Sequence, residues 1–346
     1  MTRWIVSRRQ DLLWFQGSAL LGLGLVLLFR SLPPLGPGPN PIGHPAVLVL
    51  FLWGALFDAT HVWGTYARSY LAPEAASREG VPGAWSWGLF AIGPLAAIAD
   101  HALAPGRIFA AFLVGAYLWG YWHLVRQHYG LLVLYRVRSK EFDERGARID
   151  HAILWVGCLY PYLRYTVSPA YASTGLPMIA PEAWAPAIRL ALDLGAAIAL
   201  AGLLALAVSG RGGPFRAGPK HVFLAVVLAY HWTCFAALRH PLAITAALNL
   251  FHNLQYHRIV WHYEKGRGRK PSGGLGPYLA LGVLLGIAWY GPRIAGAAVL
   301  EASLARDVLL GACWGLAFHH YLVDGRIWRV RRTPSVAQAL APGAAT

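Results

Sequence analysis

The sequence predicts an all-α integral membrane protein, a bundle of about ten transmembrane helices with both termini in the cytoplasm. Of its 346 residues, 57% are hydrophobic and only 13% are charged, which is more apolar than a soluble domain of this length needs to be. Apolar stretches near the ~20 residues that cross a bilayer recur along the whole chain. They lie at residues 11–29, 46–67, 84–104, 108–133, 151–168, 186–208, 221–238, 241–261, 275–291 and 307–323.

Basic residues support this count and set the orientation. Lys and Arg gather at both termini and after every second span, as in Arg136, Arg138 and Lys140 after the fourth, whereas residues 31–45 contain none. Because short cytoplasmic loops carry the Lys and Arg, both termini are predicted inside. The net charge of +15 then reflects basic residues that anchor the helix ends and set the topology, with attraction to anionic lipids as a consequence, and no nucleic-acid partner is expected.

The chain is predicted to form one transmembrane domain over residues 1–332, followed by a disordered cytoplasmic tail over 333–346. The three cysteines lie inside apolar spans without metal-binding spacing, so they are interpreted as packing residues. No small-residue cleavage site follows the first span, which predicts a retained helix. The high Ala, Gly, Arg and Pro content is typical of a bacterial source, and therefore of a multi-pass protein of the inner membrane.

Ionisable side chains gather in the cytoplasmic halves of the second, fourth, eighth and tenth predicted spans. Such groups are unfavourable at bilayer depth and usually mark a functional site. These four spans run in the same direction, so their polar residues fall at similar depth, where helices of a bundle can converge on a metal ion. The candidate metal ligands are Asp58, His61, His123, His128, His252, His257, His262, His319, His320 and Asp324.

Two pairs among these candidates have chelating spacing. Asp58 and His61 are three residues apart, and His320 and Asp324 are four apart, so each pair projects from one helical face. His319 points about 100° away from His320, so one of the two is expected to face the site.

Two further pairs are five residues apart, about 140° around a regular helix, namely His123 with His128 and His252 with His257. Each pair could address two ions, or provide one ligand and one orienting group. His262 lies at the membrane boundary and is interpreted as either a ligand or an interfacial residue.

Neighbouring polar residues could orient the imidazoles through the second ring nitrogen. These are Gln127, Asn253, Gln255, His231, Thr65, Tyr66, Tyr129 and Tyr256. Imidazole with carboxylate suits iron, zinc or manganese, and open positions on such a ligand set are typical of non-haem iron that activates oxygen.

The two H-x4-H boxes, His123/His128 and His252/His257, and the His319/His320 doublet resemble the histidine boxes of integral-membrane di-iron oxygenases, the class of fatty acid desaturases and hydroxylases. The spread of histidines over many spans is also similar, more loosely, to the bacterial carotene-cleaving membrane dioxygenases. The resemblance implies two irons and oxidation of an acyl chain, isoprenoid or carotenoid. The chain departs from the pattern because it lacks an H-x2-3-HH box.

The predicted function is therefore a metal-dependent oxidoreductase acting on a lipophilic substrate. No dinucleotide-binding, haem-attachment or iron–sulfur motif occurs in the sequence, so a desaturase or hydroxylase would need a separate electron-donor protein, whereas a dioxygenase would not. Two alternatives stay open. One is b-type haem electron transfer, which predicts paired histidines at two depths, and the other is a transporter or proton or metal relay that uses the His/Asp layer.

Overall fold

The computed structural model describes residues 3–36, 43–72, 80–174, 176, 180–209, 218–300, 303–329 and 333–340. Within these ranges the regular structure is helical and no strand occurs, as the sequence predicts. The chain divides into two compact units, one of Met1–Gly38 with Leu124–His252 and the other of Pro39–His123 with Asn253–Thr346. The sequence predicts a single domain over 1–332, and two helices, α6 (Ile108–Arg138) and α11 (Pro241–Gly266), each contribute to both units.

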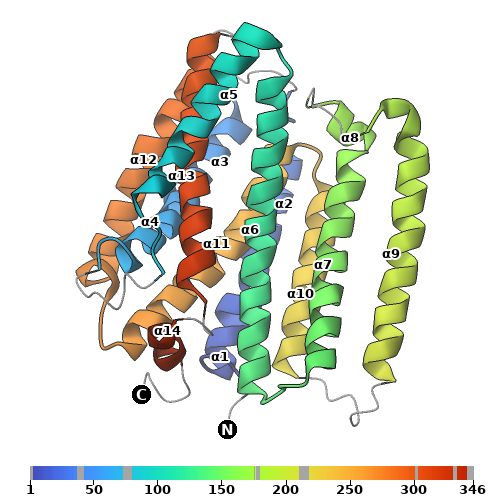
Figure 1. Cartoon of the computed structure of the whole chain (residues 1–346), viewed down its shortest axis with the longest axis vertical. Helices are drawn as coiled ribbons and strands as arrows, with labels where there is room; N and C mark the ends of the chain where they lie inside the picture. The colour runs from blue at the N-terminus through green and yellow to red at the C-terminus, as the bar shows by residue number, and fades with distance from the viewer. Residues whose placement is uncertain are drawn as a thin grey trace. The chain divides into compact units, whose positions relative to one another are not determined.

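The helices of each unit are drawn in Figure 1. Besides its parts of α6 and α11, the first unit contains α1 (Arg8–Asp11), η1 (Leu12–Gln16), α2 (Ser18–Ser31), α7 (Glu144–Thr166), α8 (Pro169–Ala172), η5 (Glu182–Trp184), α9 (Ala185–Val208) and α10 (Pro219–Ala237). The second contains α3 (Pro45–Trp53), η2 (Gly54–Asp58), α4 (Ala59–Arg68), η4 (Ala84–Gly88), α5 (Leu89–Leu103), η6 (Pro271–Gly273), α12 (Leu275–Val299), α13 (Leu304–Ile327) and α14 (Pro334–Ala339).

Each predicted apolar stretch falls on helical structure. Among the described residues, six helical segments are long and apolar enough to cross a membrane. They are Arg8–Ser31, Pro45–Arg68, Ile108–Arg138, Glu182–Leu206, Pro219–Ala237 and Leu275–Gly296. The other four predicted stretches coincide with α5, α7, α11 and α13, of which α5 has 15 residues. The six apolar segments indicate a membrane protein.

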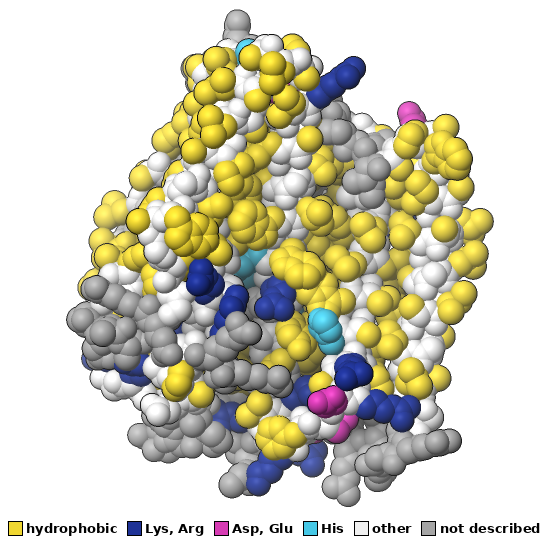
Figure 2. All heavy atoms as spheres, viewed as in Figure 1, with side chains coloured by type: hydrophobic (Ala, Val, Ile, Leu, Met, Phe, Trp, Pro, Cys, Tyr) yellow, Lys and Arg dark blue, Asp and Glu magenta, His cyan; other side chains and the backbone are white. Residues whose placement is uncertain are grey.

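Apolar side chains cover much of the surface. In Figure 2 they predominate along helices such as α9, while most of the visible Lys and Arg side chains lie in the lower part of the view. On α9, Leu190 is 60% exposed and Ile198 is 73% exposed. Large exposed apolar side chains along a whole helix are unfavourable in water and are typical of contact with lipid tails.

A buried ion cluster fixes three helices of the first unit. Asp150 on α7 accepts from Arg136 Nη1 of α6 at 2.7 Å and from Lys220 Nζ of α10 at 2.9 Å. At the start of α7, the Asp143 carboxylate accepts from the Gly146 N–H, and this bond is the main reason that the pKa of Asp143 lies below its usual value. The charges near these helix ends are therefore paired with one another.

Glycines allow close helix contacts in the second unit. A Cβ added to Gly286 of α12 would lie 2.6 Å from Ala55 Cα, and one added to Gly282 would lie 2.9 Å from Thr60 Cα. Neither distance leaves room for a side chain, so α12 packs with its backbone directly against η2 and α4. This contact supports the segment that carries Asp58 and His61.

The predicted disordered tail is partly helical, which corrects the expectation for its first residues. Helix α14 begins at Pro334 and ends at Ala339, and the side chains of Val336, Ala339 and Leu340 are buried. Gly266 at the end of α11 faces the backbone of Ala339, so the absence of a side chain there lets α14 dock. Burial of these apolar side chains stabilises the helix. The rest of the predicted tail, residues 341–346, lies outside the described residues.

Candidate metal centre

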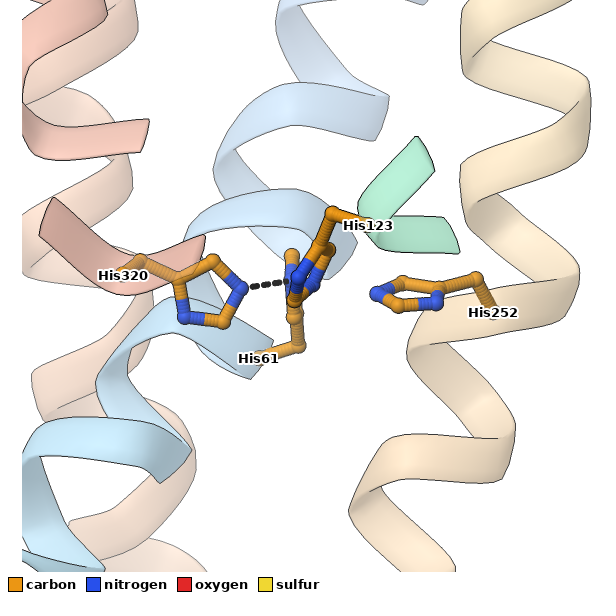
Figure 3. Close-up of side chains that lie close together, drawn as sticks. All are labelled: His61, His123, His252 and His320. Carbon is orange, nitrogen blue, oxygen red and sulfur yellow. Dashed lines mark hydrogen bonds between the residues drawn. The ribbon is translucent and has the colours of Figure 1, made fainter. Parts of the chain in front are cut away.

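Four of the ten candidate ligands come together. His61, His123, His252 and His320 each offer a ring nitrogen, and these four atoms all lie within 4.8 Å of one another. The rings extend from α4, α6, α11 and α13 and point toward one another (Figure 3). His61, His123 and His320 belong to the second unit, and His252 directly precedes its Asn253 along α11. We call these four residues the histidine group.

Distances within the histidine group suit a shared metal ion. The Nε2 atoms of His61 and His320 are 3.0 Å apart. Two nitrogens each about 2.1 Å from one ion lie about 3.0–3.4 Å apart when they are adjacent and about 4.2 Å apart when they are opposite. The 4.8 Å limit exceeds the largest of these values by roughly half an ångström. Small ring rotations would therefore bring all four nitrogens onto one ion.

A hydrogen-bond network fixes the orientation of His320. The Thr65 hydroxyl donates to Asp324 Oδ1 at 2.8 Å, so it accepts from His320 Nδ1 at 2.9 Å. Tyr256 also donates to Asp324 Oδ1, at 2.8 Å. With its proton on Nδ1, His320 presents the Nε2 lone pair to His61 and to the centre of the group.

Asp324 borders the histidine group through its second oxygen. Asp324 Oδ2 lies 3.6 Å from His320 Nε2 and 4.0 Å from His123 Nε2, while Oδ1 is held by Thr65 and Tyr256. A carboxylate at this place can balance the charge of a bound cation, and a short movement would make it a fifth donor.

Replacing Thr65 by valine is expected to weaken metal binding about 10–100-fold, the usual effect of losing a group that orients a ligand. Valine fills nearly the same volume but can neither accept from His320 nor donate to Asp324. The measurement is the metal dissociation constant from chelator competition. Thr60→Val is the matched control, because the Thr60 hydroxyl is also buried on α4 but bonds His257, outside the group. Equal weakening by both variants would contradict the assigned role of Thr65.

Asp58 lies behind His61, on the side away from His320. Its Oδ1 is 3.8 Å from His61 Nδ1, and its Oδ2 accepts from the Tyr290 hydroxyl at 2.6 Å. Asn253 Nδ2 donates to Asp58 Oδ1 at 3.5 Å. The structure therefore does not bring Asp58 into the histidine group as the three-residue spacing predicted; the carboxylate can instead orient His61.

A π-helical turn, η2 at Gly54–Asp58, precedes His61 in the second predicted span. Such a turn inserts an extra residue into a helix and re-aims the side chains that follow, and it is frequent at functional sites. A Cβ on Gly54 would lie 2.5 Å from the Tyr290 ring, so glycine is needed for α12 to reach the turn. No pattern in the sequence predicted this feature.

His257 is bonded away from the histidine group. Its Nε2 lies 3.2 Å from Thr60 Oγ1, and its Nδ1 lies 2.8 Å from the Tyr278 hydroxyl. Gly64 makes room for Tyr278, because a Cβ there would lie 2.5 Å from the hydroxyl oxygen. Both ring nitrogens thus have protein partners, and only His252 of this pair joins the group, in agreement with the 140° separation.

His319 also faces elsewhere. Its Nδ1 lies 2.9 Å from the Tyr66 hydroxyl, its Nε2 lies 3.1 Å from Ser86 Oγ, and its ring stacks on Trp87 at 4.3 Å between centroids. The expectation that one of the two adjacent histidines faces the site agrees with this placement, and that residue is His320.

The remaining predicted residues lie outside the histidine group. His128 packs against His231 in the first unit, with ring centroids 5.3 Å apart, and neither belongs to the histidine group. Gln127 of α6 donates to the His252 carbonyl of α11 at 2.8 Å, so this bond is to the backbone of a group member and not to its ring. His262 and Gln255 are buried on α11, outside the group.

Several residues that bond to site candidates were absent from the sequence expectations. They include Thr60, Tyr278 and Tyr290, and also Tyr70 and Ser86, which bond His319. Tyr278 and Tyr290 lie on α12, whose sequence is that of an ordinary apolar span, and only the fold shows which histidine or carboxylate they meet. Comparison with known proteins adds no relative, since no family model, curated protein or solved structure matches the chain.

Proposed function

We propose that the chain is a membrane metalloenzyme that holds iron on His61, His123, His252 and His320 and oxidises a lipophilic substrate with dioxygen. The observation that supports this proposal is the convergence of four ring nitrogens, three of them on buried residues, within 4.8 Å. Imidazole ligands suit iron, and also zinc or copper, whereas manganese favours more oxygen ligands. Bound iron would supply oxygen activation, and the protein would orient the ligands and exclude water.

One ion is favoured over two. Four nitrogens fill most positions of one metal and leave one or two open for a substrate or dioxygen. Of the other candidates, Asp324 lies 3.6 Å from His320 Nε2, the nitrogen that faces His61, whereas Asp58 is near only the Nδ1 of His61. His257 and His319 are bonded to other residues. A second iron would need ligands that the described residues do not bring to this place.

The substrate proposal follows from the surroundings. A site inside an apolar helical protein is reached most readily from the lipid phase, so an acyl chain, an isoprenoid or a carotenoid is the proposed substrate class. The proposed topology has ten spans with both termini in the cytoplasm of a bacterial inner membrane. Desaturation or hydroxylation would also require a separate electron-donor protein.

Ligation of a b-type haem by the histidine group is disfavoured by geometry. The two axial nitrogens of a haem lie about 4 Å apart, twice a metal–nitrogen distance of about 2 Å, with the porphyrin plane between them. The Nε2 atoms of His61 and His320 are 3.0 Å apart, and both other members of the group lie within 4.8 Å, which leaves no space for the ring.

Metal analysis with an optical spectrum of the detergent-purified full chain tests the proposal. We expect about one iron per chain and no Soret band, followed by oxygen-dependent turnover of a lipophilic substrate detected by mass spectrometry. Chain that stays metal-free after incubation with Fe²⁺, Zn²⁺ and Mn²⁺ would overturn the proposal, and would leave a relay of hydrogen-bonded histidines. Tight zinc binding without iron binding would remove the oxygenase step.

A further inference from the structure

A buried arginine lies two helical turns beyond His61, on the face of α4 that meets α13. The two helices contact each other through three successive pairs, His61 with His320, Thr65 with Asp324, and Arg68 with the carbonyl of Ile327. Arg68 is only 3% exposed. It lies about 10 Å along the helix from His61, given a rise of ~1.5 Å per residue. The contact between α4 and α13 therefore holds Arg68 at a set distance from His61 and His320.

The Arg68 guanidinium is incompletely satisfied. Its Nη2 donates to Ile327 O at 3.0 Å, and its central carbon lies 4.3 Å from the Tyr263 ring centroid and 3.9 Å from that of Trp328. Among the residues that the structure describes, its Nε and Nη1 have no hydrogen-bond partner although both atoms are buried. Three N–H bonds, one on Nε and two on Nη1, thus remain available in the plane of a stacked guanidinium.

Two carboxylates, Glu264 and Asp324, act electrostatically on this arginine. Arg68, Arg267 and Arg269 all act electrostatically on one carboxylate, Glu264, which pairs with Arg269 Nη2 at 2.8 Å. The second carboxylate that acts on Arg68 is Asp324, and its Oδ1 already accepts from two hydroxyl groups. Neither carboxylate accepts a hydrogen bond from Arg68 among the described residues, so its buried N–H groups are left for another acceptor, and leaving them unbonded is unfavourable.

We propose that Arg68 anchors a binding site for an oxyanion, a carboxylate or a phosphate. A guanidinium presents its N–H bonds in a plane that matches two oxygens of such a group, and stacking against Tyr263 and Trp328 holds that plane. The oxyanion is either the head group of an amphipathic lipid or a free anion. In the first case the inference rests on the proposed function and defines its substrate as an anionic amphiphile.

A water molecule between Arg68 and Glu264 is the competing explanation of the unused N–H bonds. It would satisfy these hydrogen bonds, and it predicts no binding of anions. Anion binding that depends on Arg68 therefore separates the two explanations.

Equilibrium binding to the full chain in a neutral detergent tests the site, with oleate, oleyl alcohol and inorganic phosphate as probes. We expect oleate or phosphate to bind the wild type, and Arg68→Gln to weaken that binding at least tenfold. Arg329→Gln is the matched control, because Arg329 is exposed and its Nε already donates to the Gly325 carbonyl oxygen of α13 at 2.9 Å. Equal binding by all three proteins would overturn the proposal, as would no binding of either anion to the wild type.

The relative affinities of the probes identify the source of the anion. Tight oleate binding with weak phosphate and oleyl alcohol binding assigns the site to a lipid head group, whereas tight phosphate binding alone assigns it to a free anion; both support an oxyanion site. If Arg68→Gln does not fold, Arg68→Lys keeps the charge but loses the fork, and weaker anion binding is still expected. A rise in the melting temperature of the wild type with added anion needs no variant.

Failure of this site and failure of the metal proposal are distinguishable. Chain from which metal has been removed by a chelator should still bind the anion, because none of the histidine group contacts the guanidinium in the interactions described for Arg68. Anion binding by a chain that never binds metal would keep the oxyanion site and reject the metalloenzyme. Metal binding without anion binding would do the reverse.

Discussion

Replacement of His320 by alanine is expected to abolish metal binding at concentrations that saturate the wild type. The ring supplies one of four nitrogens and lies 3.0 Å from the His61 nitrogen, so its loss opens the centre of the group. Loss of an orienting group weakens metal binding about 10–100-fold, and loss of a ligand should exceed this. His61→Ala should behave in the same way. The measurement is metal content by elemental analysis after equilibration with Fe²⁺ or Zn²⁺.

His257→Ala is the matched control for these variants. His257 is also a histidine on a helix of the second unit, but its nitrogens bond Thr60 and Tyr278. Its removal should lower stability by about 1–3 kcal/mol, through unsatisfied hydroxyl groups, and leave metal content unchanged. If His257→Ala loses metal as completely as His320→Ala, the ligand set assigned to the histidine group is incorrect.

Metal removal provides a second measurement of the same expectation. A ligand present at about 100 times its dissociation constant stabilises the folded state by about 2.7 kcal/mol. Addition of a chelator should therefore lower the melting temperature of the wild type and of His257→Ala. It should have no effect on His320→Ala, which has no metal to lose.

The helix positions could be predicted from the sequence because apolar length and basic flanks are local properties. The local spacing also separated His320 from His319 in direction. What spacing could not supply was the partner of each side chain. His252 and His257 are equivalent as a sequence pair, and the choice between them is made by Tyr278 and Thr60.

Asp58 is a second residue whose partner could not be predicted from spacing. A regular helix places Asp58 and His61 on one face, but Asp58 ends a π-helical turn and accepts from Tyr290, which is 232 residues away along the chain. Neither the turn nor the tyrosine has a signal in the local pattern. The division into two compact units is likewise a property of which helices pack together, and composition does not encode it.

Gly311→Ala is expected to destabilise the protein by roughly 3 kcal/mol or more, at the upper end of overpacking effects. A Cβ at Gly311 of α13 would lie 2.5 Å from the carbonyl carbon of Gly93 on α5, and one at Gly315 would lie 2.6 Å from Phe90 Cα. These obstacles are backbone atoms, which cannot rotate away as a side chain can. The Gly-x-x-x-Gly spacing of Gly311 and Gly315 thus sets the distance between α13 and α5, which run side by side in Figure 1.

Gly325→Ala makes the same chemical change on the same helix with the opposite expected sign. No atom lies within 4 Å of a Cβ at Gly325, so the variant should gain up to about 1 kcal/mol of helix propensity. Thermal unfolding in detergent measures both variants, and metal content provides a second readout. Because Gly311 and His320 share α13, pushing this helix from α5 should also displace His320 and lower metal affinity, whereas Gly325→Ala should not. Equal stability of the two variants would show that α5 does not set the position of α13, and His320 would then need another support.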